Sequence, residues 1–183
     1  MPLSSFDDEA NWVKKIKEGD SDTFESLFNK YCQSLINFSR RIVNDTETAE
    51  NIIQDVFLKV WENRGRLDPN LSIKSYLYTI ARNRSLKHQR HQTVVRDSEE
   101  TVRGLHSSVK TPDEVLDESE MASSIRLAID SLPEKCGIIF KMNRFDGLTY
   151  SEISEILEIS IKTVETQMGR ALKRLREDLS SLK

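Results

Sequence analysis

Apolar residues recur every three or four positions through the first part of the chain, and this spacing constrains the fold more than any other feature. The first run comprises Phe24, Leu27, Phe28, Tyr31, Leu35, Phe38 and Ile42. Because an α-helix turns once in about 3.6 residues, these side chains share one helix face. Only six glycines and four prolines interrupt the 183 residues, and no strand-like alternation is long enough to indicate a sheet. The sequence therefore predicts an all-α protein.

Three helices are predicted within residues 1–92. The first begins near Asp22, where Glu25 completes a capping arrangement. The second begins at residues 45–47, and its apolar face comprises Ile52, Ile53, Val56, Phe57, Val60 and Trp61. A loop over residues 65–72 leads to the third helix, whose inward-facing residues are predicted to be Tyr76, Leu77, Ile80 and Ala81. These helices would form one small domain.

Acidic residues are concentrated between two nearly neutral segments. Residues 1–92 and 123–183 each carry a net charge of +1, whereas residues 93–122 hold three basic and eight acidic side chains. This middle segment is polar and contains Gly104 and Pro112, so we expect a flexible acidic linker in which helix resumes near Asp113. The predicted organisation is two small helical domains, 1–92 and 123–183, joined by the linker 93–122.

The second domain carries a helix-turn-helix pattern between residues 149 and 176. Thr149 and Glu152 form a capping box, residues 158–160 form a short turn, and Ser160 caps a second helix. The inner face of that helix is predicted to comprise Ile161, Val164, Met168, Leu172 and Leu175. The turn begins with Glu158 where a glycine is usual, which costs on the order of 1 kcal/mol.

The outer face of this second helix carries residue types that bind DNA. Lys162, Thr163, Glu165, Thr166 and Arg170 can hydrogen-bond base edges and phosphates in a major groove, and Lys173 and Arg174 add positive charge. A helical hairpin with a merely solvated polar face is the alternative interpretation. The short turn, the two caps and the basic tail favour DNA binding.

A basic stripe mixed with aromatic residues covers residues 72–90. From Lys74 to Arg96 there are six Lys or Arg residues and no Asp or Glu. Aromatic rings offer stacking faces for unpaired bases, and basic side chains follow phosphates. The candidate residues for this contact are Tyr76, Tyr78, Arg82, Asn83, Arg84 and Lys87. A plain basic helix with core tyrosines stays open as the alternative.

The polar half of the 45–61 helix is a candidate surface for a protein partner. Its candidate residues are Asp45, Glu50, Gln54, Asp55, Phe57 and Trp61. Polar groups beside large aromatic side chains are typical of a helix face that docks on another protein. A solvated face without a partner is the alternative.

Several classes of protein find no support in the sequence. No run approaches the roughly 20 apolar residues that span a bilayer, and no signal region opens the chain, so a cytoplasmic protein without membrane insertion is expected. Cys32 and Cys136 are predicted to be buried, reduced thiols. His88 and His91 lack further ligands nearby, so neither a metal nor another cofactor is expected. No phosphate loop or nucleophile–base pattern indicates an enzyme.

Four motifs, in this order, resemble the extracytoplasmic-function (ECF) group of RNA polymerase sigma factors. They are Asp45-x-x-x-Ala49-Glu50-x-x-x-Gln54-Asp55-x-Phe57-x-x-x-Trp61, then Tyr76-Leu77-Tyr78-x-Ile80-Ala81-Arg82-Asn83, then Leu132-Pro133-Glu134-Lys135, then the helix-turn-helix. The resemblance extends from about Asp22 to Leu179. The amino-acid sequences of residues 145–150 and 161–165 are similar to those of family members from Bacteroidetes-like bacteria.

The resemblance implies partners and roles for these segments. Domain 1–92, as sigma region 2, would dock on the beta-prime clamp helices of RNA polymerase core through the 45–61 helix, and its 72–90 element would face the minus-ten element. Domain 123–183, as region 4, would read the minus-thirty-five element and pack on the beta flap. An anti-sigma factor is a further expected partner. The acidic linker would occupy a basic polymerase channel until RNA displaces it, although a plain spacer stays open.

Two other classes of helical protein are alternatives to a sigma factor. An ordinary helix-turn-helix regulator of the response-regulator output type would carry a receiver or ligand-binding domain upstream, whereas residues 22–91 predict helices and no strands. A helical interaction protein that touches no DNA is the second alternative.

Overall fold

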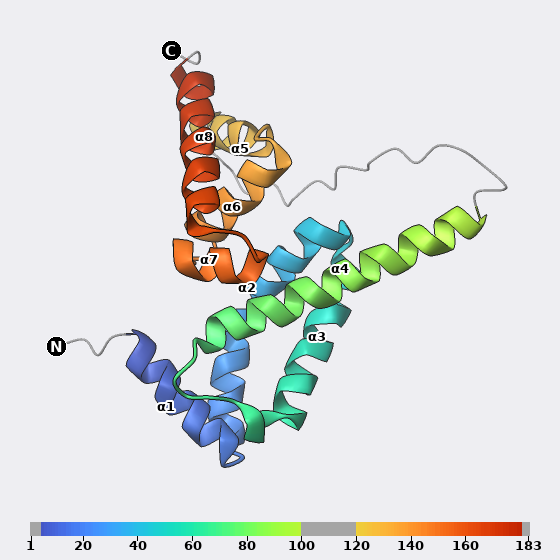
Figure 1. The fold of residues 1–183 in the computed structure, drawn as a ribbon, viewed down its shortest axis with the longest axis vertical. Helices are drawn as coiled ribbons and strands as arrows, with labels where there is room; N and C mark the ends of the chain where they lie inside the picture. Colours follow the sequence, from blue (N-terminus) through green and yellow to red (C-terminus); the bar gives the residue numbers. More distant parts are fainter. Residues whose placement is uncertain (1–4, 100–119, 181–183) are drawn as a thin grey trace. The chain divides into compact units, whose positions relative to one another are not determined.

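The computed structural model of the protein describes residues 5–99 and 120–180. These residues form eight α-helices and one short 3-10 helix, with no strand among them, which confirms the predicted all-α fold (Figure 1). They group into two compact units, with α1 to α4 up to Thr93 in the first, and α5, α6, α8 and the start of α7 in the second.

The first unit begins with a helix that the sequence did not predict. This helix, α1 (Ser5–Lys17), buries Val13 and Ile16, too few apolar residues to form a recognisable stripe. It is followed by α2 (Ser21–Val43), α3 (Thr46–Glu62), the 3-10 helix η1 (Arg64–Arg66) and α4 (Ile73–Glu99). The buried carboxylate of Glu9 accepts hydrogen bonds from Lys30 Nζ at 2.7 Å and from the Tyr31 hydroxyl, which attaches α1 to α2.

The caps of α2 and α3 show how local sequence sets the helix ends. The cap of α2 is Asp20, whose carboxylate accepts the backbone N–H groups of Asp22 at 3.0 Å and Thr23 at 3.2 Å. The predicted cap at Asp22 is therefore wrong, because Asp22 already lies in the first turn. The predicted start of the second helix is confirmed, since Asp45 accepts the N–H of Thr48 at 2.7 Å.

The core of the first unit lies where α2, α3 and α4 meet. Its fully buried side chains include Leu27, Leu35, Ile53, Val56, Leu77 and Ala81. The ring of Phe28 packs on that of Phe57 with 4.8 Å between centroids, and Phe38 packs on Tyr78 at 5.1 Å. A buried hydrogen bond of 2.8 Å joins the hydroxyls of Ser39 on α2 and Ser85 on α4. In Figure 1, α4 crosses over the α2–α3 pair.

The second unit comprises α5 (Glu120–Asp130), α6 (Glu134–Arg144), the start of α7 (Tyr150–Leu157) as far as Ser154, and α8 (Ile161–Ser180). Its core includes Leu132, Ile139, Phe140, Met142, Leu148 and Ile153. Along α8 the buried residues are Val164, Met168, Ala171 and Leu175. Ile161 and Leu172 were predicted to face inward, but they are 47% and 44% exposed. They lie beside the narrow 164–168–171–175 stripe that α5 and α6 cover.

The helix α4 extends further than the apolar pattern. The periodicity ends at Gln92, whereas the helix continues to Glu99. A helix can continue for a few residues without a buried face if no helix-breaking residue interrupts it. Residues 93–99 contain neither glycine nor proline. The linker predicted over 93–122 is therefore helical at its start, and again from Glu120. Residues 100–119, including the expected helix start at Asp113, lie outside the described residues.

Candidate nucleic-acid interface

The two helices of the predicted helix-turn-helix are fixed by local hydrogen bonds. At the start of α7, the Thr149 N–H donates to Glu152 Oε2 at 2.8 Å and the Glu152 N–H donates to Thr149 Oγ1 at 3.2 Å. At its end, the Ile159 N–H donates to the Ser154 carbonyl at 3.0 Å while Glu158 adopts a left-handed φ of 57°. The predicted capping box and turn are confirmed, and the left-handed residue ends α7 where α8 must turn away.

The orientation of α8 follows from its cap and its buried stripe. Ser160 Oγ accepts the Thr163 N–H at 3.1 Å, as predicted. Val164 and Met168 are buried, so the opposite arc of the helix faces solvent. That arc contains the seven residues of this helix that were predicted to contact DNA, and all are exposed: Lys162, Thr163, Glu165, Thr166, Arg170, Lys173 and Arg174.

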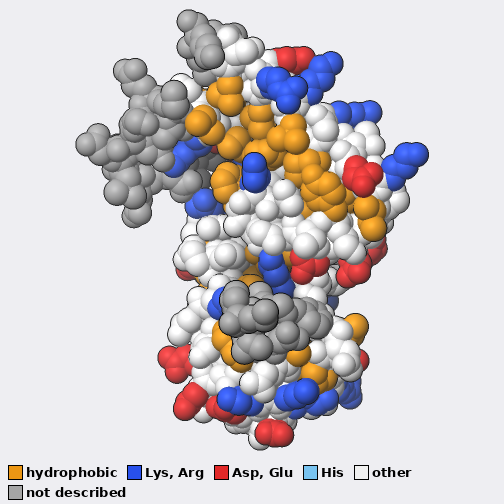
Figure 2. Space-filling view, turned by 90° about the vertical axis from the view of Figure 1, so that its left-hand side faces the viewer, with side chains coloured by type: hydrophobic (Ala, Val, Ile, Leu, Met, Phe, Trp, Pro, Cys, Tyr) orange, Lys and Arg blue, Asp and Glu red, His pale blue; other side chains and the backbone are white. Residues whose placement is uncertain are grey.

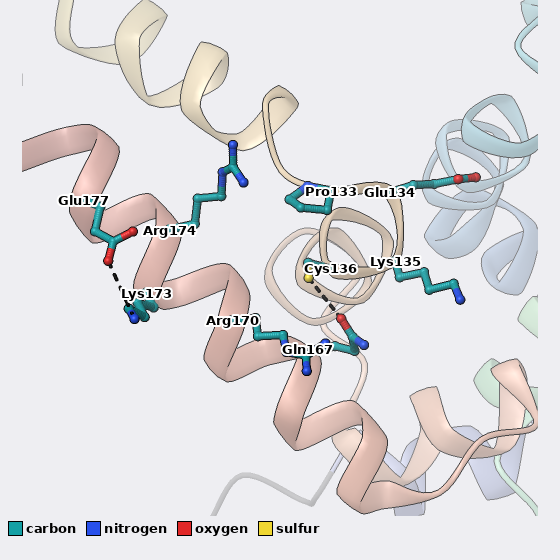
Figure 3. Close-up of a pocket in the computed structure, with 9 residues that line it drawn as sticks. All are labelled: Pro133, Glu134, Lys135, Cys136, Gln167, Arg170, Lys173, Arg174 and Glu177. Atoms are coloured by element: carbon teal, nitrogen blue, oxygen red, sulfur yellow. Dashed lines mark hydrogen bonds and ion pairs between the residues drawn. The ribbon is translucent and has the colours of Figure 1, made fainter.

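The basic end of this arc borders a groove that sequence reasoning missed. The groove has a volume of about 500 Å³ and lies between α8 and the first turn of α6 (Figure 3). The α8 side contributes Arg170, Lys173 and Arg174, and the α6 side contributes Lys135. The Leu132-Pro133-Glu134-Lys135 motif was visible in the sequence, but its position against α8 depends on tertiary packing.

The aromatic residues of α4 do not all face the direction the sequence predicted. Tyr76 was predicted to point inward yet is 43% exposed, whereas Tyr78 is fully buried against Phe38. Tyr78 is therefore a core residue and not a stacking face for bases, which corrects the prediction. Its position follows from the inward stripe of α4, which comprises Ile73, Leu77, Tyr78, Ala81 and Ser85. On the outer side, Asn83 and Lys87 are exposed, and Arg82 and Arg84 are half-buried.

A small pocket lies where the α3–α4 loop meets α4. It has a volume of about 100 Å³ and is lined by Arg66, Leu67, Asp68, Leu71, Ser72, Ile73 and Tyr76. The loop is shaped by Asp68, whose carboxylate accepts the Asn70 N–H at 2.9 Å, and by Ser72, whose hydroxyl accepts the Ser75 N–H at 3.1 Å. The exposed Leu71 and Tyr76 flank it. The sequence indicated this segment only as a loop.

The candidate partner surface on α3 is polar along most of its length. Asp45, Glu50, Gln54 and Asp55 are exposed. Trp61 is half-buried, with the Arg64 guanidinium 4.5 Å from its ring centroid.

Phe57 was predicted to belong to this surface, but it is only 3% exposed because it packs between Phe24 and Phe28 of α2. An ion pair of 3.1 Å joins Asp55 on α3 to Arg84 on α4, and thereby connects the two candidate surfaces.

Neither cysteine in the described residues forms a disulfide. Cys136 is buried as predicted, whereas Cys32 is only half-buried. Burial, together with the nearby carboxylate of Glu50, raises the pKa of the Cys32 thiol, which keeps it protonated. Among the residues placed by the structure, no cluster of three His, Cys, Asp or Glu side chains could hold a metal ion. Over the same residues, no helix has both the length and the apolar composition to cross a membrane.

Comparison with known protein families finds a match for part of each unit. Residues 27–94 match Sigma-70 region 2, and residues 122–175 match Sigma-70 region 4. The two matches together cover more than half of the chain and carry its candidate surfaces. The chain therefore belongs to the sigma-70 family of RNA polymerase sigma factors, which bind the polymerase core and direct it to promoters.

Similar proteins narrow this assignment to the ECF group. The chain is 27% identical over 179 residues to the ECF RNA polymerase sigma factor SigW of Bacillus subtilis, covering 93% of this chain and 96% of that protein. It is 24% identical over 179 residues to the RNA polymerase sigma-H factor of Pseudomonas aeruginosa, covering 93% of each. The resemblance to the ECF group is confirmed.

Solved structures share the fold. The sigma factor RpoE of Bartonella quintana, solved in complex with the anti-sigma factor NepR, matches with a TM-score of 0.68 and 21% identity, covering 86% of this chain and 96% of that one. CnrH, solved with the cytosolic domain of CnrY, matches with a TM-score of 0.63 and 18% identity, covering 94% and 97%.

Proposed function

We propose that this sigma factor divides promoter recognition between its two units, with each unit using the exposed residues described above. The observation that carries the proposal is the exposed arc of α8, which follows a capped turn in a chain that also contains region 2. The domain limits that we propose remain 1–92 for region 2, 93–122 for the linker and 123–183 for region 4.

The minus-thirty-five element would be read by the N-terminal part of α8. Recognition helices present their first turns to base edges in the major groove. Lys162, Thr163, Glu165 and Thr166 occupy those turns and are exposed. Arg170, Lys173 and Arg174 lie further along and would contact phosphates, which fix the register of the helix on the duplex.

The minus-ten element would be opened by the outer side of α4. Tyr76 offers an exposed ring beside the small pocket at the α3–α4 loop, and such a ring can stack on an unpaired base. Arg82, Asn83, Arg84 and Lys87 follow on the same helix and would contact the single strand and its phosphates. Tyr78 has no direct role because it is buried.

The polymerase core would contact both units. On α3 we propose that Asp45, Glu50, Gln54, Asp55 and Trp61 face the beta-prime clamp helices. The second unit exposes large apolar side chains, among them Leu127 at 72% and Phe145 at 60%. Figure 2 separately shows hydrophobic side chains gathered on one face of this unit. A contiguous apolar patch favours a protein partner, here the beta flap.

The proposed setting of this activity is the bacterial cytoplasm, where polymerase and chromosome meet. The protein would act by binding and not by catalysis. We also propose an anti-sigma factor as a partner, because the two solved neighbours include a sigma factor in complex with one. The net charge of −5 over residues 93–122 supports a role in a basic channel of the polymerase.

In vitro transcription over a promoter library tests the proposal. Core polymerase with the protein should start transcripts at promoters that share two spaced elements, whereas core alone or the protein alone should not. A helix-turn-helix regulator without sigma activity would bind DNA without core and would start no transcript. That result would overturn the proposal.

A further inference from the structure

The groove between α6 and α8 presents more positive than negative charge. Four cationic side chains line it, namely Lys135, Arg170, Lys173 and Arg174, against the two carboxylates of Glu134 and Glu177. Glu177 lies 3.9 Å from Lys173, and this i,i+4 pair is exposed on both sides, so it holds Lys173 only weakly. The groove therefore favours an anionic ligand.

The first turn of α6 adds partial positive charge to the same place. Its cap position is Pro133, which makes no side-chain capping hydrogen bond. The first backbone hydrogen bond of the helix runs from the Gly137 N–H to the Pro133 carbonyl at 2.8 Å. The N–H groups of residues 134–136 precede that bond and lie at the positive end of the helix dipole, beside the groove's four cations.

A part-buried hydrogen bond orients the remaining polar side chain of the groove. The Cys136 thiol donates to Gln167 Oε1 over 3.0 Å. Because the carbonyl oxygen of the amide is turned toward sulfur, its NH₂ group points the other way, as Figure 3 shows. Cys136 is only 5% exposed, so this donor is held in place by the core. Gln167 thereby presents N–H donors, as an anion site requires.

We infer that this groove binds a phosphate of the DNA backbone next to the minus-thirty-five element, with Lys135 as a contact from outside the helix-turn-helix and Cys136 as the positioning residue for Gln167. DNA is the anion that the geometry favours, because Arg170 belongs both to the groove and to the exposed arc of α8 that we place on the duplex. The inference rests on the proposed function, since it needs α8 on the duplex.

The contact of Lys135 is tested with holoenzyme on a promoter selected from the library. Lys135→Ala should weaken binding roughly three- to tenfold, evenly across promoter sequences, and should lower the slope of log affinity against log salt by about 1. Arg144→Ala is the matched control, because it removes an exposed cation from the other end of α6. An unchanged salt slope for Lys135→Ala, or an equal change in both variants, would overturn the phosphate contact.

The role of Cys136 is tested by a double-mutant cycle in the same binding assay. Cys136→Ala and Gln167→Ala should each weaken binding, and the double variant should bind no more weakly than Gln167→Ala alone. Cys136→Ser keeps a donor and should retain the affinity of the unmodified protein. If the two effects multiply, or if serine behaves like alanine while all variants unfold at the same temperature, Cys136 does not position Gln167.

The experiments distinguish a groove that binds no phosphate from a proposed function that is wrong. If Lys135→Ala has no effect but Glu165→Gln changes the preferred base, α8 reads DNA and the groove does not bind it. If neither variant changes promoter binding by a holoenzyme that still transcribes, the placement of α8 on the minus-thirty-five element is itself wrong. An acidic peptide of the polymerase in the groove would show as weaker core binding by Lys135→Ala in the absence of DNA, and would also overturn the inference.

Discussion

Among the described residues other than glycine, two adopt a left-handed backbone conformation, and their φ angles are nearly the same: 58° for Asn44 at the end of α2 and 57° for Glu158 at the end of α7. A β-carbon is strained there, and asparagine tolerates the strain better than glutamate because its short polar side chain bonds locally. Both positions end a helix, so the strain is the cost of a sharp turn.

Replacing Glu158 by glycine should therefore stabilise the protein. We expect a gain of up to about 1 kcal/mol, because glycine adopts this φ without strain. Asn44→Gly is the matched control and should gain less. Calorimetric unfolding of the full chain measures both, and a larger gain at Asn44 than at Glu158 would contradict the argument.

Glu165 is the acidic residue in the exposed arc at the start of α8. A carboxylate close to DNA phosphates is repelled, so its presence indicates a specific acceptor role, which in a major groove is the amino group of cytosine. Glu165→Gln should relax the preference at one minus-thirty-five base pair by roughly 1–3 kcal/mol.

Lys173→Ala is the control for this prediction, because it should weaken binding evenly over all sequences. Selection from a promoter library with each variant holoenzyme measures both effects. The division of roles on α8 would be wrong if Glu165→Gln shifted all promoters equally while Lys173→Ala changed the base preference.

At the scale of elements, α3 depends on its N-terminal cap. Hydrogen bonds from the side chain and the backbone N–H of Thr48 lower the pKa of Asp45 below its ordinary value of 3.8. A carboxyl whose folded pKa is depressed contributes stability above its unfolded pKa and loses it as the pH falls through the folded value. The cap should therefore weaken only below about pH 4.

Asp45→Asn separates the hydrogen bond from the charge. Asparagine still accepts the Thr48 N–H, so α3 should remain folded at neutral pH. The contribution of the cap to the free energy of unfolding should, however, no longer change between pH 5 and pH 2. Unfolding in denaturant at a series of pH values, compared with the unmodified protein, measures the difference. An identical pH dependence for the two proteins would mean that the Asp45 carboxylate is not the titrating group.

The two tyrosines of α4 should behave as different kinds of residue. Tyr76→Ala should leave stability almost unchanged and should reduce opening of the minus-ten element, because Tyr76 is exposed. Tyr78→Ala should destabilise the first unit by about 3–5 kcal/mol, because it leaves a cavity against Phe38.

Permanganate reactivity of promoter thymines in the holoenzyme complex, together with thermal unfolding, distinguishes the two effects. Normal thymine reactivity with Tyr76→Ala would remove Tyr76 from the minus-ten contact. A stable Tyr78→Ala protein would contradict the packing described here.

At the scale of the whole molecule, we expect that neither unit directs transcription by itself. Each carries only one positive charge more than its negative ones, so the free protein should bind promoters weakly. The polymerase would join the two proposed DNA-binding surfaces into one complex and would raise the effective concentration of the second contact once the first has formed.

Binding to core polymerase should therefore depend on α3. The double variant Gln54→Ala, Asp55→Lys should bind core more weakly without loss of helicity, because both residues are exposed and neither belongs to the core of the unit. Asp55→Lys also removes the ion pair with Arg84, which is exposed enough to contribute at most about 1 kcal/mol. Glu25→Lys, on the exposed face of α2, is the charge-reversal control. If the double variant and the Glu25→Lys control captured core polymerase equally well, α3 would not belong to the polymerase interface.

The sequence by itself determined the features that depend on near neighbours in the chain. The cap at Asp45, the Thr149–Glu152 capping box, the turn at Glu158 and the cap at Ser160 are all made by residues within five positions of each other. Periodicity and the scarcity of glycine and proline determined the all-α class. The motifs in their order also determined the family, because each has a fixed local pattern.

Only the tertiary structure decided which side of a helix is buried and what lies against it. The sequence of α4 offers apolar residues on more than one side, and contact with Phe38 and Ser39 of α2 decides that Tyr78 and Ser85 face inward while Tyr76 faces out. The groove between Lys135 and α8 exists for the same reason, since burial depends on helices that are far apart in the chain and its free energy depends on the area they cover together.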